Sequence, residues 1–151
     1  MNKYKILEDQ YIEVCGKKLY RIQALKDFDN VKAGDIGGYI ESESNLSQSG
    51  NAWVRDNAQV CDNAWVCGDA RVCGTRHYLN LGPIGSRNGY TTIYRDKNKK
   101  AIVVCGCFSG NLDDFERAVH KTHAGTKYEA EYMALIQLAR MREKEWLNEV
   151  D

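Results

Sequence analysis

A short loop, "LGPIGSRNGY" at residues 81–90, combines residue types that bind anions. It holds Pro83, the only proline of the chain, among three glycines. Glycine lets backbone N–H groups approach an anion closely, Ser86 and Asn88 offer side-chain hydrogen bonds, and Arg87 supplies the planar guanidinium that suits phosphate. The loop lacks the G-x-x-x-x-G-K-[ST] pattern of a Walker A motif. We interpret it either as an anion-binding loop or as a tight connection that carries a surface arginine.

A second group of residues has the types that bind zinc. The segment "CGCF" contains Cys105 and Cys107, and "HKTH" places His120 and His123 about one helical turn apart. This C-x-C and H-x-x-H spacing matches no common structural zinc pattern. The sequence therefore favours a strand and a helix end for these residues, with a metal site as the alternative.

The familiar catalytic patterns are missing from the sequence. It contains no Ser-His-Asp order, no HExxH motif and no paired catalytic carboxylates. Asp113 and Asp114 fit the first turn of a helix, where negative charge opposes the helix dipole. We therefore expect no catalytic residue, no metal and no cofactor, and a function in binding.

The elements that must position these residues follow Gly74. The loop lies between a strand ending at Leu81 and strands predicted from "GYTTIYRD" and "KAIVVCGCF", which join at a turn over 96–99. The segment "GNLDDFERAVHKTH" predicts a helix with Asn111 as N-cap, and a long helix follows over about 127–148. The order β-β-α-α predicts a small two-layer domain.

Two apolar residue types recur every six residues between positions 50 and 74. The alternating sets are Ala52, Ala58, Ala64, Ala70 and Val54, Val60, Val66, Val72. A helix needs an apolar spacing near 3.6, so short strands separated by turns fit this period better. Trp53 and Trp65 fall on the opposite phase and are expected to be exposed. The cysteines of the repeat are interpreted as small residues tolerated after each valine.

This pattern resembles the hexapeptide repeat of left-handed β-helices, in which three hexads complete one triangular coil. Upstream, "YIEVCGKKLYRIQAL" predicts a β-hairpin that turns at Gly16-Lys17 and caps the first coil. The predicted fold class is α+β, with the hairpin and β-helix in residues 1–74 and the two-layer domain in residues 75–151. So short a coil cannot bury its own ends, and we expect a homo-oligomer, either a trimer or a hexamer.

Composition and charge exclude several function classes. The 21 basic and 21 acidic side chains balance, which argues against a bulk nucleic-acid binder. The N-terminal segment has no signal-peptide pattern and no stretch approaches the length of a membrane span, so we expect a cytoplasmic protein without a membrane partner. The three histidines, at positions 77, 120 and 123, lie outside the repeat, which argues against an acyltransferase of the hexapeptide class.

Two resemblances bear on origin and function. Residues 1–74, with "LYRIQAL", "GDIGGYIESESNLSQ" and the hexads, resemble the N-terminal half of many phage and prophage proteins. Residues 77–148 resemble the anti-Thoeris phage proteins through the order of the Gly-Ser-Arg loop, the hairpin, "CGCF", the two helices and the polar loop between them. That resemblance implies an oligomer that sequesters cyclic ADP-ribose isomers or cyclic oligonucleotides between its subunits without cleaving them.

The anti-Thoeris resemblance also implies roles for particular residues. Phe115 would stack on a base, and the "AGT" loop, with Gly125 and Thr126, would line the pocket. Arg142, with Arg140 as a second candidate, would reach the phosphates from the last helix. Two residues apart on one helix, these arginines cannot both face one pocket. An asparagine expected in the loop between the helices is absent from this sequence.

The leading hypothesis is therefore a phage-encoded binding protein that sequesters a cyclic nucleotide signal and counteracts host defence. The first alternative is a structural or assembly protein, or an inhibitor of a host protein, that uses the β-helix to trimerise. An enzyme that acts on a nucleotide phosphodiester is the remaining alternative.

Overall fold

The structure is a computed structural model that describes residues 1–150. It divides into two compact units, Met1–Thr75 and Arg76–Asp151. The division falls next to the boundary predicted after residue 74. No helix within residues 1–150 has the length and apolar character needed to cross a membrane.

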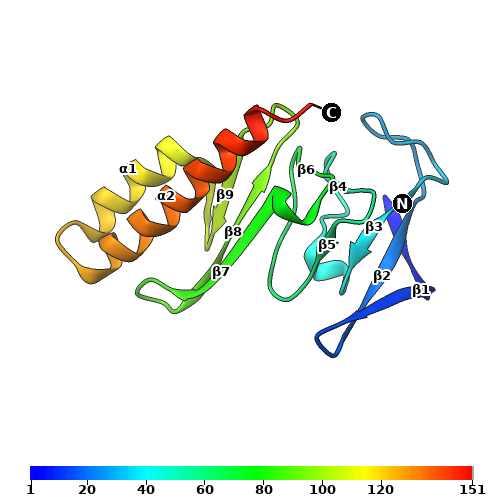
Figure 1. Ribbon diagram of the computed structural model, residues 1–151, viewed down its shortest axis with the longest axis horizontal. Coiled ribbons are helices and arrows are strands. Elements are labelled where there is room, and N and C mark those ends of the chain that lie inside the picture. The colour runs from blue at the N-terminus through cyan, green and yellow to red at the C-terminus, as the bar shows by residue number, and fades with distance from the viewer. Residues whose placement is uncertain (151) are drawn as a thin grey trace. The chain divides into compact units, whose positions relative to one another are not determined.

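The N-terminal unit consists of a long antiparallel hairpin, several short strands and one turn of 3-10 helix (Figure 1). Its elements are β1 (Tyr4–Val14), β2 (Lys17–Ala24), β3 (Ile36–Ile40), η1 (Glu43–Asn45), β4 (Trp53–Val54), β5 (Gln59–Val60) and β6 (Arg71–Val72). The first three strands pair antiparallel, so the predicted hairpin is present, with its turn between Val14 and Lys17. After β3 the pairing becomes parallel, with β3 beside β5 and β4 beside β6.

The six-residue repeat forms a coil that stacks on the chain preceding it. Val54 pairs with Val72 and Leu46 with Val66, both in parallel, and the Asn51 amide reaches Asp69, 18 residues along the chain. Every alanine and valine of the repeat is buried. The coil therefore returns beside itself after about three hexads and buries the predicted residues. A left-handed β-helix remains our prediction for its class.

The corners of the coil explain the turn-forming residues of the repeat. Positive φ angles occur at Gly50 (73°), Asp56 (57°), Asp62 (58°) and Gly68 (62°), one every six residues. Glycine adopts this left-handed conformation without strain, and aspartate tolerates it better than most residues do. Each hexad therefore carries a residue suited to its corner.

The burial of Trp53 corrects one expectation. Its side chain is only 4% exposed. The Trp53 ring contacts the edges of Tyr4 and Phe28, at centroid distances of 6.3 and 5.3 Å. Residues from β1 and from the loop after β2 thus cover a position that the repeat alone places outside. Trp65 is half-buried.

The C-terminal unit is a four-stranded antiparallel sheet with two helices. The 3-10 turn η2 (Thr75–His77) starts at the last residue of the first unit. The elements that follow are β7 (Tyr78–Ile84), β8 (Gly89–Arg95), β9 (Ala101–Cys105), β10 (Phe108–Asn111), α1 (Leu112–His123) and α2 (Lys127–Leu147). The strand order is β10-β9-β8-β7. Both helices lie side by side along one face of the sheet (Figure 1). The predicted strands correspond to β8 and β9 and, for the strand expected to end at Leu81, to β7; β10 is an additional strand at the other edge of the sheet.

The core of this unit lies between the sheet and the helices. Ile93 and Val103 from the sheet pack against Leu135 and Trp146 from α2, and all four side chains are buried. The Trp146 indole N–H donates to the carbonyl of Arg76 at 2.9 Å, which ties the end of α2 to η2, directly before β7. These contacts fix the helices over the sheet and so fix the residues that line the cavity described next.

Candidate functional site

A cavity of about 470 Å³ opens in the C-terminal unit. Its walls come from the β7–β8 loop, the β9–β10 turn, α1 and Tyr132 of α2. This volume falls within the range of about 300–1,000 Å³ that is usual for small-molecule sites. All of the lining residues belong to the C-terminal unit.

One face of α1 forms the longest wall. It presents residues at helical spacing, namely Phe115, Ala118, Val119, Thr122 and His123. The helix begins after Asn111, whose side-chain oxygen accepts the backbone N–H of Asp114 at 2.8 Å. Asp113 and Asp114 occupy its first turn, as the sequence predicts. The Asn111 cap therefore fixes where α1 begins, directly after β10 and next to the cavity.

The β7–β8 loop reaches the cavity through a tight turn fastened to α2. Gly85 has a positive φ of 77°, and a Cβ there would lie 1.9 Å from the Tyr132 hydroxyl oxygen. The Gly85 N–H donates to the Glu131 carboxylate at 3.0 Å, and the Asn88 N–H donates back to the Gly85 carbonyl at 3.3 Å. Only glycine fits beside Tyr132, so the turn needs it to present Arg87 at the cavity.

Tyr132 joins the walls of the cavity. The Cys105 thiol lies 4.0 Å from its hydroxyl, and the Phe115 ring meets its ring edge-on at 5.7 Å. Burial, and after it the Cys105 thiol, raises the pKa of Tyr132 to about 12, while the Arg87 charge acts in the opposite direction. The phenol therefore stays protonated at neutral pH and can donate a hydrogen bond.

Three predicted site residues meet at the cavity. Ser86 and Arg87 line it from the loop and are exposed, and Phe115 lines it from α1. Phe115 is only 4% exposed and packs against Phe108 and Tyr132, so it forms part of the apolar floor. A stacking role for Phe115 remains a prediction, with little of its surface open to a base.

Four further residues predicted for the site do not line this cavity, nor does Asn88, which closes the loop turn. The four are Gly125, Thr126, Arg140 and Arg142. Gly125 turns the chain with a φ of 77°, and the Thr126 hydroxyl caps α2 by accepting the Glu129 N–H. Both residues therefore shape the helix junction.

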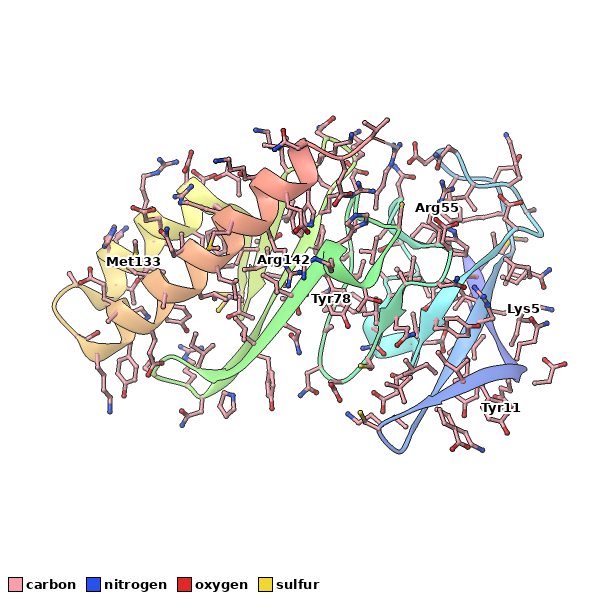
Figure 2. All side chains as sticks on the ribbon, viewed as in Figure 1. Lys5, Tyr11, Arg55, Tyr78, Met133 and Arg142 are labelled. Atoms are coloured by element: carbon pink, nitrogen blue, oxygen red, sulfur yellow. The ribbon has the colours of Figure 1, made fainter. Side chains whose placement is uncertain are left out.

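The two arginines of α2 are engaged elsewhere in the unit. Arg140 donates to Glu116 at 2.6 Å and to Asp113 at 3.2 Å, and the Glu116 hydrogen bond raises the pKa of Arg140. Arg142 points toward the start of β7 (Figure 2), where it donates to the Arg76 carbonyl at 3.0 Å. Neither guanidinium reaches the cavity, because a closer acceptor holds each one.

The cysteines and histidines considered for zinc do not gather into one site. Cys105, Cys107 and His123 line the cavity, but His120 lies between Glu116 and Glu129 outside it. Within residues 1–150, no three His, Cys, Asp or Glu side chains converge on a metal position. The arrangement offers a cavity with thiol, phenol and imidazole groups.

Sequence reasoning did not assign His123, Tyr132 or Cys105 to the site. The spacing of Phe115, Val119 and His123 on one helix gives a signal for the first, because residues four apart share a face. No comparable signal exists for Tyr132 and Cys105, which meet only after α2 packs on the sheet.

Comparison with known proteins gives one partial match. No family model matches the chain. A protein of Escherichia coli (strain K12) named "Uncharacterized acetyltransferase YdcK" is 43% identical to it over 63 residues. The match covers 37% of this chain and 19% of that relative, so most of the relative's length has no counterpart in the match. Similarity to a named acetyltransferase thus extends over part of the chain only.

Proposed function

We propose that the C-terminal unit captures a cyclic nucleotide in its cavity and sequesters it without cleavage. The observation that carries this proposal is the placement of Ser86 and Arg87 at one side of a cavity whose floor is aromatic. Guanidinium and hydroxyl groups suit phosphate oxygens, and aromatic side chains suit a base. The anti-Thoeris resemblance narrows the ligand to a cyclic ADP-ribose isomer or a cyclic oligonucleotide.

Sequestration requires affinity rather than chemistry. A signal near micromolar concentration is depleted only if the dissociation constant is at or below that level, which corresponds to about −8 kcal/mol. In a phage-infected cell, such capture would blunt a defence pathway that depends on the nucleotide. We propose that the protein is phage-encoded and acts in this way as a homo-oligomer in the cytoplasm.

Binding and release measurements test the proposal. The purified protein is titrated by calorimetry with cyclic ADP-ribose isomers and with cyclic di- and trinucleotides. The complex is then heated, and the released ligand is identified by chromatography. Intact nucleotide after heating supports sequestration, altered nucleotide indicates an enzyme, and no binding to any member of the panel contradicts the proposal.

Acyl transfer is a second candidate, favoured by the partial similarity to a named acetyltransferase. The histidines of this chain, His77, His120 and His123, lie outside the repeat, which speaks against a catalytic base within the coil. Incubation with acetyl coenzyme A and a panel of amines, with detection of free thiol, tests it. Release of coenzyme A above the protein-free rate would favour this candidate over sequestration.

A further inference from the structure

Two histidines of α1 lie three residues apart but have different surroundings. His120 lies outside the cavity, with its Nδ1 2.8 Å from Glu129 and its Nε2 3.4 Å from Glu116. His123, the last residue of the helix, lines the cavity. Among the ion pairs of residues 1–150, none joins His123 to a carboxylate. The imidazole of His123 thus faces the ligand space without a neutralising acid.

Two tyrosines of α2 hold the His123 ring in place. The centroid of its ring lies 5.4 Å from that of Tyr132, and the two rings are tilted by 30° from each other. Tyr128 meets it at 6.0 Å and 65°. The hydroxyl of Tyr132 in turn contacts Gly85 of the loop. The imidazole and the loop that carries Arg87 are therefore positioned by the same side chain.

The charged groups near this corner each contact a neighbour other than His123. Glu131 accepts the Gly85 N–H, and Glu129 accepts the Gly125 N–H as well as binding His120 outside the cavity. Lys127 lies over the Tyr128 ring, with its Nζ 5.3 Å from the ring centroid.

The phenol of Tyr132 and the thiols of Cys105 and Cys107 also line the cavity, and none of them forms an ion pair with His123. Burial keeps the phenol of Tyr132 neutral, with a pKa of about 12. Cys105 receives a hydrogen bond from Thr91 at 3.2 Å, and Cys107 lies exposed in the β9–β10 turn. An anion in the cavity thus meets Arg87 and, when it is protonated, His123.

We infer that His123 is the second anion-binding group of the cavity and takes up a proton from solvent when an anionic ligand is captured. This inference rests on the proposed nucleotide binding. A protonated imidazole donates from both nitrogens and forms charge-assisted hydrogen bonds to phosphate oxygens. Because the bound state then holds more protons than the free state, affinity falls as pH rises through the range in which histidine titrates.

Calorimetry with cyclic di-GMP tests the inference, because the charge of its phosphodiesters is constant between pH 5.5 and 8. We expect the wild-type protein to bind it about tenfold more weakly at pH 8 than at pH 5.5, the loss of one charge-assisted contact. His123→Gln should remove most of this pH dependence. His120→Gln is the matched control, and it should retain the dependence because its ring faces the two glutamates outside the cavity.

Proton uptake gives a second readout that a structural role would not move. Titrations in two buffers of different ionisation enthalpy report the number of protons bound with the ligand. Uptake by the wild-type protein near pH 7 that disappears in His123→Gln supports the inference. Equal uptake and equal pH dependence in both proteins overturn it, while leaving the proposed nucleotide binding intact.

Sulfate separates failure of the inference from failure of the proposed function. Sulfate is fully ionised between pH 5.5 and 8, and it carries no nucleobase, so its binding reports the anion site alone. Should cyclic di-GMP not bind, the ring C–H resonances of His123 and His120 are titrated by NMR with and without sulfate. A sulfate-induced shift of the His123 titration to higher pH, without a shift for His120, supports an anion site at His123 although cyclic di-GMP is not its ligand. No shift overturns the inference.

Discussion

Arg87 lines the cavity and is exposed, whereas Arg76, Arg117 and Arg140 of the C-terminal unit pair with carboxylates. Arg117, for example, pairs with Asp114 one turn away on the outside of α1. A guanidinium that contacts phosphate contributes about 1.5–3 kcal/mol through charge-assisted hydrogen bonds. We therefore expect Arg87→Ala to weaken nucleotide binding by about 10- to 100-fold in calorimetry. Arg117→Ala is the control, and equal losses in the two variants would contradict a specific contact.

A buried lysine gives the N-terminal unit a pH-dependent stability. Lys3 is buried and donates to the Ala52 carbonyl at 2.6 Å, with its Nζ 5.0 Å from the Phe28 ring centroid. Burial, and after it the charge of Lys26, lowers the pKa of Lys3 from 10.5 to about 8. Because the unfolded chain holds the proton up to higher pH, the free energy of unfolding contributed by this group rises between about pH 8 and 10.5.

Replacement of Lys3 by methionine tests this effect. Lys3→Met keeps the length of the side chain and removes the titrating group. Across pH 7 to 10.5, the wild-type protein should gain free energy of unfolding relative to the variant, as measured by urea denaturation. Parallel curves for the two proteins would show that Lys3 does not titrate with a lowered pKa. A Lys26→Met variant should keep most of the gain in free energy of unfolding. The charge of Lys26 is only the second cause of the lowered Lys3 pKa, after burial.

The corners of the coil give a prediction at the scale of the element. Asp56 adopts a φ of 57°, which costs a β-branched residue about 1–2 kcal/mol and glycine almost nothing. Asp56→Val should lower the free energy of unfolding by about that amount, and Asp56→Gly should leave it unchanged or raise it slightly. Urea denaturation followed by circular dichroism measures both variants. A similar loss in both would mean that the aspartate side chain matters rather than its backbone conformation.

The junction of α1 and α2 depends on one histidine. Hydrogen bonding to Glu129 is the main cause that raises the pKa of His120, and Glu116 adds to it. Hydrogen bonds to Arg140 and to His120 are the main causes that lower the pKa of Glu116 and of Glu129 respectively. The stabilisation linked to His120 is therefore complete below its usual pKa of 6.5 and is lost as pH rises through its raised value.

A single substitution tests this junction. His120→Gln keeps one hydrogen-bond donor and removes the charge. We expect the melting temperature of the variant to lie furthest below that of the wild-type protein near pH 6 and to approach it by pH 9. The measurement is differential scanning calorimetry over this range. A constant difference at all pH values would attribute the effect to shape and not to protonation of His120.

Burial within a single element can be predicted from the sequence more fully than contacts between elements. The hexad spacing predicts the buried residues of the coil, such as Val54 and Val72, because period and burial are properties of one segment. It fails for Trp53, which is covered by Tyr4 and Phe28 from segments far away in sequence. The same limit explains why Arg140, paired with α1, could not be excluded from the site in advance.

At the scale of the whole molecule, the two units differ in what supports them. The C-terminal unit has helices that cover one face of its sheet and a core of its own. In the N-terminal unit, β5 and β6 each end a sheet within the described residues. At β5, the Thr75 hydroxyl accepts the Gln59 N–H at 3.2 Å. A coil this short depends strongly on what lies at its ends.

This dependence leads to a prediction about assembly. Strands that end a sheet at the end of a short coil favour association of subunits. We expect sedimentation equilibrium to give about three or six times the chain mass of 17.2 kDa, for a trimer or a hexamer. Tyr11 lies on the β1–β2 hairpin with 46% of its surface exposed (Figure 2), so Tyr11→Ser serves as a surface control that should keep the same mass.

Substitutions that introduce a positive charge test whether the β5 edge of the coil forms the contact between subunits. Gln59→Lys adds an ammonium to β5, and Asn57→Lys adds the same charge at the neighbouring corner. Like charges repeated across a symmetric contact repel, so Gln59→Lys should lower the sedimenting mass at low salt if this edge forms the contact, and added salt should restore it. A wild-type mass of 17.2 kDa would contradict the predicted oligomer and would require the coil to be stable as a single chain.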